Sequence, residues 1–191
     1  MSEVKNILLV GVGGQGTILA SKILSNGLVS AGYDVKMSEV HGMAQRGGSV
    51  STQVRYGKKV YSPIIGKGQA DILVSFETME ALRWLEYLAP TGKVVVNDYQ
   101  IPSAPILMGK REYPAGVLEL LKEKADTTVI CAAQIAERLG NAKAMNVVLF
   151  GALVKAMKID YIDWEEVIKT SVKASAVPVN LLAFQEGLKV K

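Results

Sequence analysis

The sequence predicts an α/β protein with a Rossmann-like, mostly parallel sheet and helices on both faces. Three observations support this prediction. A glycine-rich turn directly follows the first apolar run, short strand patterns alternate with longer segments of helical periodicity, and 191 residues suffice for a sheet covered on two faces. No linker or internal repeat interrupts the pattern. We therefore expect one domain over residues 1–191, with a helical C-terminal third.

The first half of the chain supplies most of the predicted strands. Strand patterns occur at Asn6–Val10, Asp34–Val40, Ser49–Tyr56 and Asp71–Phe76, and helical patterns at Gln15–Ala31 and Glu77–Leu88. The alternation in Ser49–Tyr56 is typical of a strand with one exposed face. Val60–Ile65 is predicted to return as a strand, at an edge because Pro63 has no N–H. Together these two segments would insert an antiparallel β excursion into the sheet.

The second half turns from strands to helices. Pro90–Gly92 is expected to break the chain, and a proline-rich connection, Ile101–Met108, follows the next strand. The predicted elements are strands at Lys93–Asn97 and Thr127–Cys131 and helices at Ala115–Lys124, Ala132–Leu139, Ala142–Met157, Trp164–Ala174 and Val179–Leu188. The longest apolar stretch, Ala144–Met157, is shorter than the roughly 20 residues of a membrane span. We expect it to be a buried or partner-facing helix, and we expect no membrane interaction.

Composition excludes several classes of function. The net charge is +4 and aromatic residues are 6% of the chain, but the basic residues form no stripe, so nucleic-acid binding is not expected. The single cysteine, Cys131, cannot form an internal disulfide, complete a zinc site or hold an iron–sulfur cluster alone. It is predicted to be a buried residue at a strand end. Because Met1–Lys5 does not resemble a signal peptide, we expect a cytoplasmic protein.

The glycine turn, Gly11-Val-Gly-Gly-Gln-Gly16, has the geometry of an anion-binding site. Gly11 is expected to take backbone angles closed to other residues, Gly13 to let a ligand approach, and Gly16 to let helix and strand pack closely. The N–H groups from Gly14 to Thr17 would then face a ligand at the positive end of the helix dipole. A phosphate is the expected ligand, although a G-x-G-x-x-G match alone is also typical of a simple tight turn.

A second segment, His41–Gly48, lies just beyond the end of the second predicted strand and beside the glycine turn. Arg46 can pair with a phosphate or a partner carboxylate, or be an ordinary surface arginine. Glu39 is a candidate for ribose hydroxyls, and His41 for an interface or structural contact. The candidate cofactor-binding or subunit-interface residues are Gly11, Gly13, Gly14, Gln15, Gly16, His41 and Arg46.

Motifs for complete catalysis are absent from the sequence. No Walker lysine follows the glycines, and there is no G-x-S-x-G elbow, metal-ligand cluster or poised acid–base pair. Glu77, Asn97 and Asp98 follow strand ends and could line the crevice, but a helix cap explains Glu77 and a turn explains Asp98. We predict no catalytic residue and no metal site in this chain.

Several segments together resemble the gamma-type domain of 2-oxoacid:ferredoxin oxidoreductases, which act on pyruvate, ketoisovalerate and related acids. They are Gly11–Gly16, Glu39–Gly48 followed by a strand, Asp71–Glu77, Gly140–Asn146 at a helix start and Asn180–Gly187. The resemblance spans essentially the whole chain and is closest to the small, beta-type subunits that serve indolepyruvate, an aryl 2-oxoacid. The combination of the Arg-Gly-Gly segment with the glycine turn is more specific than either alone.

The resemblance implies the accessory half of an enzyme complex. In that family a large subunit carries thiamine diphosphate and iron–sulfur clusters, and the complex converts a 2-oxoacid and coenzyme A into acyl-CoA and CO2 while it reduces ferredoxin. This chain would bind none of those cofactors itself. Its partners would be the large subunit and, through the complex, ferredoxin. Three alternatives stay open: the gamma subunit of a pyruvate or 2-oxoglutarate oxidoreductase, a nicotinamide- or flavin-binding oxidoreductase that uses Glu39, and a stand-alone binding module.

Overall fold

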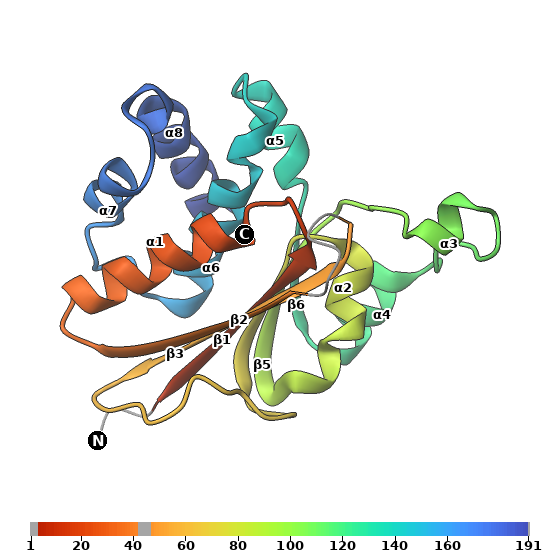
Figure 1. The fold of residues 1–191 in the computed structure, drawn as a ribbon, viewed down its shortest axis with the longest axis horizontal. Helices are drawn as coiled ribbons and strands as arrows, with labels where there is room; N and C mark the ends of the chain where they lie inside the picture. The colour runs from red at the N-terminus through yellow and green to blue at the C-terminus, as the bar shows by residue number, and fades with distance from the viewer. Residues whose placement is uncertain (1–3, 42–46, 191) are drawn as a thin grey trace.

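The computed structural model describes residues 4–41 and 47–190 and shows a six-stranded sheet with helices on both faces (Figure 1). The strands are β1 (Lys5–Val12), β2 (Asp34–His41), β3 (Ser49–Gly57), β4 (Ala70–Ser75), β5 (Leu88–Asn97) and β6 (Asp126–Ile130). Their order is β2-β3-β1-β4-β5-β6. Neighbours from β1 to β6 pair in parallel, whereas β3 is antiparallel to both β1 and β2. The predicted mostly parallel sheet is confirmed.

The helices divide between the two sides of the sheet. One side carries α1 (Thr17–Ser30), α5 (Ala132–Arg138), α6 (Met145–Met157), α7 (Trp164–Ser171) and α8 (Val177–Leu188), and the other carries α2 (Thr78–Arg83) and α4 (Val117–Lys124) (Figure 1). The short α3 (Ala104–Leu107) lies apart from both layers. Single 3-10 turns lie at Leu85–Tyr87, Ala142–Ala144 and Ala174–Ala176. The helical C-terminal third is therefore confirmed.

Alternation along β1 divides its side chains between two hydrophobic cores. Ile7 and Leu9 belong to the larger core beneath α1 and α6, and Leu8 and Val10 belong to the smaller core beneath α2 and α4. A strand covered on both faces needs apolar residues at every position. That requirement explains the continuous apolar run before the glycine turn.

Helix α6 is the centre of the larger layer. Every side chain from residue 145 to residue 154 is buried, so the longest apolar stretch of the sequence is a buried helix. Its Gly151 faces Gly187 of α8 so closely that a Cβ built on Gly187 would lie 2.1 Å from the backbone oxygen of Val148. Glycine permits this backbone-to-backbone crossing. Within the described residues, no helix is both long and apolar enough to cross a bilayer.

The predicted return strand at Val60–Ile65 is wrong. The backbone N–H of Val60 donates to Asp34 Oδ2 at 2.9 Å, and that of Ile65 donates to Gln53 Oε1 at 2.6 Å. These N–H groups therefore donate to side chains and not to the backbone of a neighbouring strand, and Pro63 has no N–H to donate. Strand β3 instead lies between β2 and β1, which leaves β2 at the sheet edge.

The expected chain break at Pro90–Gly92 is also wrong, because these residues lie inside β5. The pairing of β5 with β4 shifts register between Ala70 and Ile72, and this irregularity accommodates the proline near the strand start. The proline-rich connection after β5 contains α3, a helix of four residues that the sequence pattern did not indicate.

Candidate functional site

The glycine turn lies at the carboxyl edge of the parallel strands, between the end of β1 and the start of α1 (Figure 1). Helix α1 has no side-chain cap and no acidic residue in its first turn, whereas α2 and α7 are capped by Glu77 and Asp163. The first N–H groups of α1 therefore have no carboxylate partner in the first turn of the helix. An anion at this position would accept from those groups and interact favourably with the helix dipole.

Two glycines of the turn have roles other than those expected. Gly11 lies inside β1 without a positive φ, and a Cβ there would approach Gln15 Oε1 at 2.8 Å and Phe76 Cβ at 2.9 Å, so it provides space. The turn glycines with a positive φ are Gly14, at 104°, and Gly16, at 82°. Gly16 packs against Asn146 of α6 and not against a strand, because a Cβ on Gly16 would lie 2.4 Å from Asn146 Nδ2.

Side-chain amides connect the ends of four strands at this edge. Gln15 accepts from the Val12 N–H and donates to the Phe76 carbonyl, both at 2.8 Å. Asn97 donates to that same carbonyl at 3.2 Å and accepts from the Ala132 N–H at 2.9 Å. Because Asn97 is fully buried and its amide is bonded at both ends, the edge is held in one arrangement. Asn97 therefore supports the crevice from beneath it. The sequence indicates only that Asn97, at the end of a strand, could line the crevice.

A pocket of 440 Å³ opens on the α1 side of the glycine turn. It is lined by Gly13, Gly14, Gly16, Thr17, Ile18, Glu39, His41 and Val50. The structure therefore brings Glu39 and His41 of β2 to the same cavity as the glycines, although β3 separates β2 from β1. A cavity with a helix N-terminus at one side and a carboxylate at the other can hold a phosphate and a hydroxyl-bearing group together.

A second pocket, of 320 Å³, opens on the opposite side of the turn. It is lined by Gly13, Gly14, Gln15, Tyr99, Ile101, Ala133, Glu137, Ala142 and Met145. Gly13 and Gly14 thus form the wall between the two cavities. A ligand or a partner segment that crosses this wall would contact the backbone of both glycines.

Arg46 lies outside the described residues, but Gly48 and Ser49 form hydrogen bonds to the glycine turn and to α2. The Gly13 N–H donates to the Gly48 carbonyl at 2.9 Å, which continues the pairing of β1 with β3 into the turn. Ser49 Oγ donates to Glu80 Oε2 at 2.5 Å, and Glu80 is buried. Gly48, two positions after Arg46 in the chain, therefore lies directly against the glycine turn. The roles of Arg46 and of the other candidate residues in binding stay predictions.

The remaining polar candidates have structural partners. Glu77 caps α2 by accepting from the Glu80 N–H at 2.8 Å, as the helix-cap interpretation predicts. Asp98 is exposed, and its N–H donates to the Ile130 carbonyl at 2.8 Å. Cys131 follows β6 directly and is half-buried, so it is less buried than predicted.

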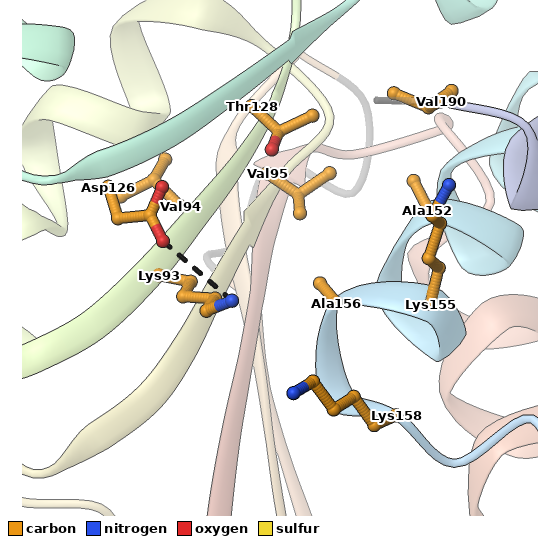
Figure 2. Close-up of a pocket in the computed structure, with 10 residues that line it drawn as sticks. All are labelled: Lys93, Val94, Val95, Asp126, Thr128, Ala152, Lys155, Ala156, Lys158 and Val190. Atoms are coloured by element: carbon orange, nitrogen blue, oxygen red, sulfur yellow. Dashed lines mark ion pairs between the residues drawn. The ribbon is translucent and has the colours of Figure 1, made fainter.

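Another cavity lies at the opposite edge of the sheet, between β5, β6 and the end of α6 (Figure 2). It measures 190 Å³ and contains Lys93, which pairs with Asp126 at 3.7 Å, together with Lys155 and Lys158. Lysines at a helix C-terminus interact favourably with the helix dipole, which explains Lys155 in the last turn of α6 and Lys158 at its C-cap. None of the candidate residues from the sequence lies there, so the glycine-turn edge is the candidate site.

Comparison with known proteins identifies relatives along the full length of the chain. Residues 6–190 match the family described as pyruvate ferredoxin/flavodoxin oxidoreductase. Indolepyruvate oxidoreductase subunit IorB of Pyrococcus horikoshii is 39% identical over 192 residues, which cover 96% of this chain and 94% of that protein. The 2-oxoglutarate synthase subunit KorC of Methanothermobacter thermautotrophicus is 30% identical over 195 residues, 96% of this chain and 93% of that protein.

A solved structure shares the fold. The gamma subunit of a keto/oxoacid ferredoxin oxidoreductase from Geobacter sulfurreducens superposes with a TM-score of 0.72 at 22% identity, over 97% of this chain and 96% of that one. At this level of identity the likeness concerns the fold, which agrees with the α/β architecture that the sequence predicts.

Proposed function

This chain belongs to the pyruvate ferredoxin/flavodoxin oxidoreductase family, and on that basis we propose that it is the small subunit of an indolepyruvate:ferredoxin oxidoreductase. In this proposal residues 1–191 act as one gamma-type domain that assembles with a large subunit in the cytoplasm. The large subunit holds thiamine diphosphate and iron–sulfur clusters and passes electrons to ferredoxin. The complex forms acyl-CoA and CO2 from an aryl 2-oxoacid and coenzyme A.

The observation that carries the proposal is the identity to IorB over nearly the whole of both chains. The identity to KorC is lower, 30% against 39%, over the same share of this chain. A subunit of a 2-oxoglutarate oxidoreductase is therefore the second candidate. The lone Cys131 supports a role without electron transfer, because one cysteine cannot hold an iron–sulfur cluster.

The chain's own contribution would be made at the glycine-turn edge. The uncapped start of α1 and the backbone of Gly13 and Gly14 are suited to the phosphates of coenzyme A or to a backbone segment of the large subunit. Glu39 lies across the same cavity, where it can accept from hydroxyl groups. Because the edge is held by the amide of the fully buried Asn97, binding would require little rearrangement.

Reconstitution tests this function. The purified chain is expected to reduce neither ferredoxin nor viologen, whereas the chain combined with its large subunit is expected to do so when indolepyruvate and coenzyme A are added. The measurement is coenzyme A-dependent viologen reduction with indolepyruvate and with 2-oxoglutarate. A preference for 2-oxoglutarate would favour the second candidate. Activity of the chain alone, or binding of a dinucleotide by the chain alone without any response to the large subunit, would overturn the proposal.

Arg46→Ala tests the loop beside the glycine turn. If the guanidinium pairs with a phosphate or a carboxylate, its loss should cost about 1.5 to 3 kcal/mol, and Arg46→Lys should recover only part of this because the planar fork is missing. A coenzyme A contact would raise the KM for coenzyme A and leave the affinity between the subunits unchanged. An interface contact would instead weaken subunit association and make it more sensitive to salt. Unchanged values for both would leave Arg46 as a solvated surface residue.

A further inference from the structure

The connection from β5 to α4, residues 98–116, forms an arm that extends away from the sheet with α3 near its end (Figure 1). The hydrogen bonds of residues 103–110 stay within the arm, where the N–H groups of Ile106 to Lys110 donate to carbonyls from Ser103 to Ile106. Helix α3 has no buried residue. The arm therefore receives its local shape from its own turns and not from packing on the core.

Both ends of the arm are attached to one buried carboxylate. Glu77 is fully buried, and its Oε1 accepts from the Ile101 N–H at 3.2 Å and from the Tyr113 hydroxyl at 2.5 Å. The same hydroxyl accepts from the Met79 N–H at 2.9 Å. Burial, and next the hydrogen bond to Glu77, raise the pKa of Tyr113, so the hydroxyl keeps its proton. These hydrogen bonds attach both ends of the arm to the start of α2.

The end of the arm is apolar and carries two cations, Lys110 and Arg111, followed by one exposed carboxylate, Glu112. Leu107 and Met108 are 74% and 68% exposed, among the largest exposures of apolar side chains in the described residues. Lys110 and Arg111 follow on the exposed surface, and neither has an ion-pair partner within residues 4–41 and 47–190. Leu107 and Met108 belong to neither hydrophobic core, and two neighbouring apolar side chains exposed to this extent point to an interaction surface.

We propose that this arm docks into the large subunit, with Leu107 and Met108 in an apolar pocket whose rim is acidic and faces Lys110 and Arg111. The inference rests on the proposed function, because it names the contact surface of that complex. Apolar side chains would supply the affinity, and the two cations would select an acidic rim and speed association.

The position of the arm favours the large subunit as its partner. Tyr99 and Ile101, at the root of the arm, line the same pocket as Gly13 and Gly14, so the arm continues the edge where the large subunit is proposed to bind. A second copy of this chain fits less well. Pairing of two copies through their arms would place two Lys110–Arg111 pairs in one interface, and the accumulation of like charge there is unfavourable.

The test uses the double variant Leu107→Glu/Met108→Glu in the reconstituted complex, with Leu182→Glu as a matched control. Leu182 is 55% exposed on α8, away from the arm. The double variant should raise the Kd for the large subunit on the order of a hundredfold, given the usual contribution of two buried side chains, and the control should keep the wild-type Kd. The double variant Lys110→Gln/Arg111→Gln should bind more weakly at low salt and show a flatter dependence on salt.

The outcomes separate the two proposals. If the wild-type chain forms an active complex and the Leu107→Glu/Met108→Glu variant binds equally well, the arm proposal is wrong while the proposed function stands. If Leu182→Glu weakens assembly as much, the effect is not specific to the arm and the proposal is wrong. If the wild-type chain neither binds nor activates the large subunit, the proposed function fails and the arm proposal with it. Loss of self-association in the isolated variant, at an unchanged Kd for the large subunit, would assign the arm to a second copy.

Tyr113→Phe tests the fixed attachment of the arm. The change keeps the ring but removes the hydroxyl that joins Glu77 to the Met79 N–H. A less restrained arm loses part of its preorganisation, so we expect a several-fold higher Kd for the large subunit with the tip residues intact. The far-ultraviolet circular dichroism should not change. An unchanged Kd would show that the hydrogen bonds to Glu77 do not position the arm.

Discussion

Replacement of Gly187 by valine is expected to lower the free energy of unfolding by about 3 kcal/mol or more, which is at the upper end of overpacking effects. A Cβ at this position would lie 2.1 Å from the Val148 oxygen and 2.8 Å from the Gly151 Cα. These are backbone atoms, so relief requires α6 and α8 to move apart. Because α6 is the centre of the larger core, the movement would open contacts well beyond the crossing itself.

Urea unfolding followed by circular dichroism measures this effect. Leu182→Val is the matched control, because it places the same residue type in the same helix at a position that is 55% exposed. Valine is a better helix former than glycine, so helix propensity alone would stabilise Gly187→Val. An unfolding midpoint for Gly187→Val at or above that of the wild type would show that the two helices do not cross as closely as the structure places them.

The sequence predicted the elements that are regular and deeply buried. A strand that is covered on both faces is apolar along its length, so the continuous apolar run within Asp71–Phe76 is a direct signal of a buried strand. It did not predict that β3 enters between β1 and β2, because strand order depends on pairings between residues far apart in the chain. Nor did it show that side chains, Asp34 and Gln53, replace the ladder beside Val60–Ile65.

At the candidate site the sequence predicted the location better than the individual roles. Glycine spacing predicted the position of the turn, but the turn residues with a positive φ are Gly14 and Gly16, whereas Gly11 provides space for Gln15. The side-chain amides of Gln15 and Asn97 both donate hydrogen bonds to the Phe76 carbonyl. This arrangement depends on which strand ends lie next to one another in the folded sheet. One signal was available: a polar residue at the end of a buried strand must find a buried partner.

Gly13→Val is expected to leave the fold intact and to reduce turnover of the reconstituted complex on the order of a hundredfold, as displacement of a reacting group by about 1 Å can do. Gly13 is not one of the described glycines with a positive φ, so valine would not meet the steric penalty of a left-handed backbone there. Its N–H can still donate to the Gly48 carbonyl. The branched side chain would occupy space that borders both cavities of the site.

The measurement is kcat/KM for coenzyme A together with the Kd for the large subunit, with Gly66→Val as the control. Gly66 also lacks a positive φ, lies at the other edge of the sheet, and would direct a new Cβ at the side chain of Gln69. If Gly13 faces coenzyme A, kcat/KM falls while the Kd holds. If it faces the large subunit, the Kd rises as well. A folded Gly13→Val complex with wild-type values for both would mean that the turn only joins β1 to α1, because neither a phosphate nor a partner backbone could approach Gly13 past a valine side chain.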